Sequence, residues 1–146
     1  MTITDIIDYI RGLGGVLVLS PTEGSGHPEL SLGDHFFYYA PDGEVPTRTQ
    51  PFATIVTKDY PGDDRSHLDR PGAFRVNIAA GKQAFLDHAR PDTDPSVPDT
   101  VHAHPVYGAA SWLAVVDPAE RTEATVRALL RTAHERARAR VERHAG

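Results

Sequence analysis

Cysteine is absent from this chain of 146 residues. Without thiols there is no disulfide bond, no thiolate metal site and no cysteine nucleophile, so His, Asp and Glu remain as the possible metal ligands. A glycine-rich phosphate loop is also missing, because Gly12, Gly14 and Gly15 precede a predicted strand instead of following one. We therefore expect no cofactor.

Long hydrophobic runs are missing too. No apolar stretch approaches the roughly 18 residues that cross a bilayer, and the N-terminus has no basic stretch followed by a hydrophobic segment. The sequence therefore predicts a cytoplasmic protein without a membrane partner. Its length suits one domain over residues 1–146, and the 40% of apolar residues is an ordinary value for a globular protein.

Lysine is scarce, and the basic charge is concentrated at the C-terminal end. The net charge is −5, but residues 121–146 carry +4 from seven arginines and three glutamates, while residues 1–120 carry −9. The arginines are Arg121, Arg127, Arg131, Arg136, Arg138, Arg140 and Arg143. A basic segment of this kind can contact nucleic acid or an anionic membrane, but an Arg-rich outer face is also a common way to keep a helix solvated and charge-paired, and we favour that second interpretation. The acidic body makes nucleic acid an unfavourable partner, so weak DNA binding through the last helix is only a second alternative.

Periodicity predicts an α+β fold. Apolar residues at helical spacing indicate a first helix near residues 3–13 and a last helix beginning at Asp117-Pro118 or Thr122-Glu123. A short helix is expected over 82–89, and strands over 16–19, 30–32, 35–39, 52–57, 73–78 and 111–116. We expect a single antiparallel sheet with the N-terminal and C-terminal helices packed on it.

Four segments carry a resemblance to a known family. They are FFYYAPDG (36–43), PFATIVTKDYP (51–61), RPGAFRVNI (70–78) and HPVY (104–107), followed by Trp112. In order and spacing they resemble DUF6194, a bacterial family of unknown function, over nearly the whole chain. The layout is also similar to MmcQ/YjbR-like proteins, which implies a CyaY-like fold with a tryptophan strand before the C-terminal helix. The frataxin branch of this fold binds iron through an acidic first helix, where this chain has only Asp5 and Asp8.

Two histidines are weak candidates for a metal site. His102 and His104 lie two residues apart, so an extended backbone would point both to one face. Folding would have to supply a third ligand, such as Asp69 or His67. The alternative, which we favour, is that His104 caps a turn before Pro105 and that His102 is exposed to solvent.

A second constellation could hold an anion. Arg75 and Asn77 share one face of a predicted strand, Lys58 ends the preceding strand, and His104 could join them. Arg75 and Lys58 would act as anion clamps and His104 as an acid–base group in an enzyme acting on a small anionic substrate. That alternative predicts that all four side chains converge on one pocket. A polar network around a long loop would explain the same residues without catalysis.

The interpretation we favour is a small binding or interaction module. We expect its groove between the sheet face and the loop at residues 60–72, with an exposed aromatic or apolar surface or a dimer interface as its mark. The sequence does not name its partner, and a small anionic ligand and a homodimer are the two possibilities.

Overall fold

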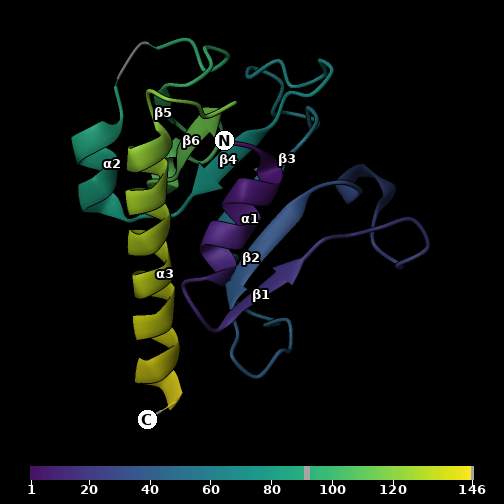
Figure 1. Ribbon diagram of the computed structural model, residues 1–146, viewed down its shortest axis with the longest axis vertical. Helices are drawn as coiled ribbons and strands as arrows, with labels where there is room; N and C mark the ends of the chain where they lie inside the picture. Colours follow the sequence, from purple (N-terminus) through teal and green to yellow (C-terminus); the bar gives the residue numbers. More distant parts are fainter. Residues whose placement is uncertain (91–92, 146) are drawn as a thin grey trace.

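The computed structural model describes residues 1–90 and 93–145, and for residue 145 the backbone alone (Figure 1). Six strands form one antiparallel sheet in the order β1-β2-β3-β4-β6-β5. The strands are β1 (Val16–Leu19), β2 (His35–Tyr39), β3 (Ala53–Val56), β4 (Arg75–Ile78), β5 (Val101–Ala103) and β6 (Leu113–Val116). The expected α+β class with one antiparallel sheet is confirmed.

Two helices cover one face of this sheet. Helix α1 (Ile3–Arg11) packs on β1, and α3 (Glu123–Ala145) packs on β2 and β4, with the two helices in contact (Figure 1). The apolar stripe of α1 places Ile6 and Ile10 in the core beside Val76 and Ile78 of β4. The short helix α2 (Lys82–His88) lies against the edge strand β5.

Local caps explain where the two long helices begin. Thr2 and Asp5 form a capping box at the start of α1, each side chain accepting the other residue's backbone N–H. The carboxylate of Asp99, from a distant part of the chain, holds the turn that leads into α3, because it accepts the N–H groups of Ala119 and Thr122. Of the two expected starts for the last helix, the one at Glu123 is therefore confirmed.

The opposite face of the sheet carries polar side chains. Strand alternation turns Val76 and Ile78 toward the helices, and Arg75 and Asn77 away from them. The segment between β3 and β4 folds over this second face, where Leu68 packs on Val56 and Val116. The β3–β4 loop therefore buries Arg75, a charged residue that would otherwise face solvent.

One expected strand is wrong. Residues 30–32 were expected to be extended, but Glu29–Ser31 form the 3₁₀ helix η1. The Ser31 hydroxyl donates to the Pro28 carbonyl at 2.8 Å, which closes a turn in place of a ladder. Leu30 is 41% exposed, so no burial favours an extended segment there.

Across the residues that the structure describes, no helix has both the length and the apolar character needed to cross a membrane.

Candidate functional site

The guanidinium of Arg75 is the centre of a buried polar network under the β3–β4 loop. Its Nη1 and Nη2 atoms donate to the two carboxylate oxygens of Asp63 at 2.9 and 2.6 Å. Nη1 also donates to Ser66 Oγ at 2.9 Å, and Nε donates to Asn77 Oδ1 at 2.8 Å. Nη2 lies 3.1 Å from His104 Nε2. Four of the five N–H donors of Arg75 are therefore used by Asp63, Ser66 and Asn77.

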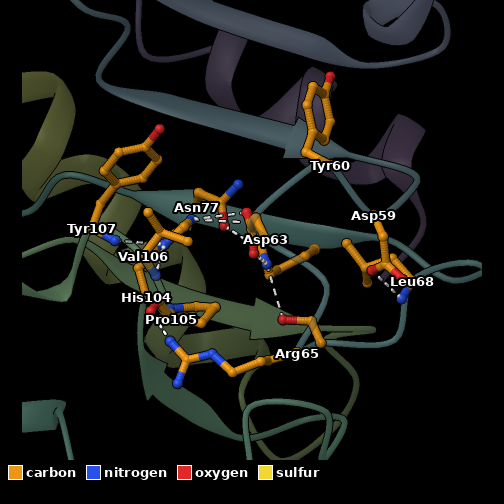
Figure 2. A network of polar contacts seen from close by, with 12 residues as sticks. Asp59, Tyr60, Asp63, Arg65, Leu68, Asn77, His104, Pro105, Val106 and Tyr107 are labelled. Atoms are coloured by element: carbon orange, nitrogen blue, oxygen red, sulfur yellow. Dashed lines mark hydrogen bonds and ion pairs between the residues drawn. The ribbon is translucent and has the colours of Figure 1, made fainter.

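Asp63 supplies the carboxylate that pairs with Arg75. Burial alone would raise the pKa of its carboxyl, but the hydrogen bonds and charge of Arg75 outweigh burial, and the pKa lies below its ordinary value. Figure 2 shows Asp63 beside Asn77 and His104, with the loop carrying it across the sheet. Arg75 is 1% exposed, so an external anion reaches it only if this loop moves.

His104 closes the other side of the network and also caps a turn. Its Nδ1 accepts the backbone N–H groups of Val106 and Tyr107 at 3.1 and 3.0 Å, which confirms the expected cap before Pro105 (Figure 2). Burial, followed by the positive charge of Arg75, lowers the pKa of His104 to about 4. The imidazole is therefore neutral at pH 7.

The groove expected between the sheet and the loop at 60–72 is filled. Ser66 and Leu68 are buried beneath the loop, and the guanidinium of Arg65 donates to the Pro105 carbonyl across it. The loop is also tied to itself, because Asp59 accepts the Leu68 N–H at 2.8 Å (Figure 2). An open depression of about 360 Å³ lies outside the loop, against the segment that holds Asp94.

Lys58 does not join the other three candidates. Its Nζ donates to Asp34 Oδ1 at 3.0 Å and to the Leu32 carbonyl at 2.7 Å. The hydroxyl of Tyr60 donates to the same carboxylate, and burial together with that contact raises the pKa of Tyr60. The predicted convergence of four side chains is thus wrong for Lys58, because Asp34 offers it a fully buried carboxylate. Arg75, Asn77 and His104 do come together.

His102 is also placed differently from the expectation. It is 2% exposed, with Nδ1 at 3.0 Å from Thr93 Oγ1 and Nε2 at 2.9 Å from the Val97 carbonyl. Solvent exposure was therefore a wrong expectation, because residues 93–97 fold over the ring. Within residues 1–90 and 93–145 no three His, Asp or Glu side chains form a group suited to a metal ion.

A cleft of about 210 Å³ lies at the end of the sheet, beside the C-terminal half of α3. Four aromatic side chains line it: Tyr38 and Tyr39 at the end of β2, Phe52 before β3, and Trp112 before β6. Tyr39 is fixed in place, since a Cβ built on Gly15 would lie 2.7 Å from its ring, and its ring meets His134 edge-on at 5.4 Å. The Tyr39 ring of this wall is therefore preformed.

One face of α3 forms the other wall of the cleft. Residues at helical spacing line it: Ala133, Arg136, Ala137, Arg140 and Val141. The two alanines have the smallest side chains on this face, which leaves the hollow open. Arg136 donates to the Ala79 carbonyl at 3.3 Å, so its guanidinium is held at the cleft.

The other arginines of α3 differ in their partners. Arg127 and Arg138 form ion pairs with Glu123 and Glu142, four residues away on the same helix. Among the described residues, no hydrogen bond or ion pair involves Arg140. The basic segment is thus partly charge-paired, and two of its other arginines, Arg136 and Arg140, line the cleft.

Sequence reasoning missed both Asp63 and the cleft. Asp63 lies in a loop whose path no periodicity encodes. The sequence does contain a pattern that indicates the cleft, because small and basic residues alternate along one helix face from Ala133 to Val141, and residues 35–39 are a predicted aromatic strand.

Comparison with known proteins gives a family without a described activity. No curated protein matches the chain, and no solved structure does. A profile described as "Family of unknown function (DUF6194)" matches residues 1–146. The chain therefore belongs to the DUF6194 family.

Proposed function

We propose that this protein is a small binding module that holds a small anionic ligand in the cleft between α3 and the end of the sheet. The observation that carries the proposal is the pair of cations at the cleft. Arg136 and Arg140 stand one helical turn apart on the same wall, and aromatic side chains line the same cleft. Arg136 uses one donor on the Ala79 carbonyl, whereas no hydrogen bond or ion pair involves Arg140 among the described residues. Cations at a concave surface attract anions from solvent.

Binding is favoured over the enzyme alternative for two reasons. An anionic substrate would need the guanidinium of Arg75, which already holds the carboxylate of Asp63. A general base works best when its pKa is near the working pH, and His104 has a pKa of about 4. His104 is thus better suited to capping its turn than to moving protons at pH 7.

The wider setting of this function rests on the sequence. We expect one domain over residues 1–146, acting in the cytoplasm, with an intracellular metabolite-sized anion as its ligand. The likeness of the layout to MmcQ/YjbR-like proteins and a homodimeric state stay predictions, and the cleft geometry needs neither of them.

Trp112 makes the proposal directly testable. It is the single tryptophan of the chain and it lines the cleft, so its fluorescence reports on that site. Inorganic phosphate, titrated at low ionic strength, is expected to change this fluorescence with saturation. Arg140→Ala should weaken the binding at least about fivefold, as a loss of about 1 kcal/mol from one surface charge implies.

Arg138→Ala provides the matched control. It removes the same charge from the same helix, but Arg138 is paired with Glu142 and does not line the cleft. The affinity of Arg138→Ala for phosphate should stay within about twofold of the wild-type value. Equal weakening by both variants would mean that only the general charge of α3 attracts the anion, and would contradict the proposal.

A further inference from the structure

The cleft is not uniform from its floor to its mouth. Near the floor, Phe52 and Ala133 are buried. At the mouth, Thr49, Gln50 and Arg140 are exposed. The apolar part of a ligand would therefore lie inward, and its charged part would lie at the mouth.

The shape of the inner part selects among apolar groups. Tyr39 and Trp112 line the sheet side, whereas Ala137 contributes only a methyl group from α3. Aromatic rings favour offset or edge-to-face contacts with other rings, each worth more than the buried area alone. The floor thus suits a flat ring better than a branched aliphatic chain.

We infer that the ligand is an aromatic anion, with a flat ring against Tyr39 and Trp112 and a phosphate or carboxylate group at Arg140. This inference rests on the proposed function, because it specifies the ligand class of the same cleft. The volume of about 210 Å³ limits the buried part to one ring system. Arg136, held by the Ala79 carbonyl, adds a second cation near the anionic group.

Three probes separate the contributions of ring and charge. Phenyl phosphate carries both, inorganic phosphate carries the charge alone, and phenol carries the ring alone. We expect phenyl phosphate to bind at least about tenfold more tightly than either of the others, which corresponds to about 1.4 kcal/mol. Trp112 fluorescence supplies the readout for all three titrations, with an independent check by calorimetry.

The outcomes distinguish this inference from the proposed function. If phosphate and phenyl phosphate bind equally, and Arg140→Ala weakens both, the proposed function stands and the aromatic inference fails. If none of the probes binds, or if Arg140→Ala changes none of them, both fail. If phenol binds as tightly as phenyl phosphate, the anionic group contributes nothing and both fail again.

A second variant tests the place of the ring without touching an arginine. Ala137→Phe fills the inner cleft and should weaken phenyl phosphate at least about tenfold, while phosphate at the mouth is affected about twofold or less. Ala139→Phe is the matched control, because residue 139 is an exposed position on the far side of α3. Undiminished binding of phenyl phosphate to a folded Ala137→Phe protein would overturn the inference.

Discussion

Arg75 and Arg140 show two opposite uses of the same side chain. Arg75 is 1% exposed and directs four of its five N–H donors at Asp63, Ser66 and Asn77. Arg140 is exposed at the mouth of a cleft. An arginine whose donors are consumed within the fold acts on stability, whereas one with unused donors at a concave surface is suited to binding.

The buried network also positions a loop. Removing two charges from water has a large energetic penalty, which their attraction offsets only when the geometry is good and the remaining donors are satisfied. Both conditions hold for Arg75 and Asp63, which form a bidentate pair inside a set of further hydrogen bonds. The network therefore specifies where the β3–β4 loop lies, more than it adds to net stability.

The largest effect should follow the loss of Arg75. Arg75→Met leaves the Asp63 carboxylate partly buried without its partner and should lower the free energy of unfolding by about 3–5 kcal/mol. Arg48→Met, at an exposed loop position, should change it by less than about 0.5 kcal/mol. Urea denaturation at pH 7 measures both.

A double variant checks the cause of that loss. Arg75→Met combined with Asp63→Leu removes both charges and should recover at least about half of the stability lost by the single variant. If the double variant is less stable than Arg75→Met alone, the unpaired carboxylate is not the source of the loss.

A smaller effect should appear on acidification. His104 has a folded pKa of about 4, below its ordinary value of 6.5, so the unfolded chain binds more protons between these values. The free energy of unfolding should thus fall as the pH drops from about 6.5 to 4, by up to about 1.4 kcal/mol per pH unit from this group. Urea denaturation at intervals of pH measures the slope.

His104→Asn tests the assignment of that slope. The amide oxygen of Asn can still accept the N–H groups of Val106 and Tyr107, but it does not titrate. The variant should show a shallower pH dependence, while His27→Asn, in an exposed loop, should keep the wild-type slope. Part of the slope will remain, because burial also lowers the pKa of His35. An unchanged slope in His104→Asn would rule out His104 as its source.

The smallest effect on stability should come from Arg140. Because it is exposed and contributes no hydrogen bond among the described residues, Arg140→Ala should change the free energy of unfolding by less than about 0.5 kcal/mol. The same urea titration measures this change. If Arg140→Ala lowers the free energy of unfolding by more than about 2 kcal/mol, Arg140 is a structural residue like Arg75.

Local sequence patterns explain why some of this was predictable. Alternation along residues 73–78 places Arg75 and Asn77 on one face of a strand. Helical spacing places Ile6 and Ile10 on the buried face of the first helix. These features depend on residues a few positions apart. The fold class therefore followed from periodicity.

Long-range partners were not predictable in the same way. Lys58 pairs with Asp34 across 24 positions, and residues 93–97 bury His102. Both arrangements depend on the paths of irregular segments, whose conformations are set by tertiary contacts instead of periodicity. The cleft forms only where α3 meets the end of the sheet, so the residue pattern of α3 alone did not reveal it.

The most direct test of Arg140 as a binding residue is the indole N–H resonance of Trp112 during a titration with phenyl phosphate. The single tryptophan gives one such signal from the wall of the cleft. We predict a saturable shift in the wild-type and Arg138→Ala proteins, and at least about tenfold weaker binding in Arg140→Ala. A signal that does not move in the wild-type protein, or that titrates equally in Arg140→Ala, would contradict the assignment of this cleft as the binding site.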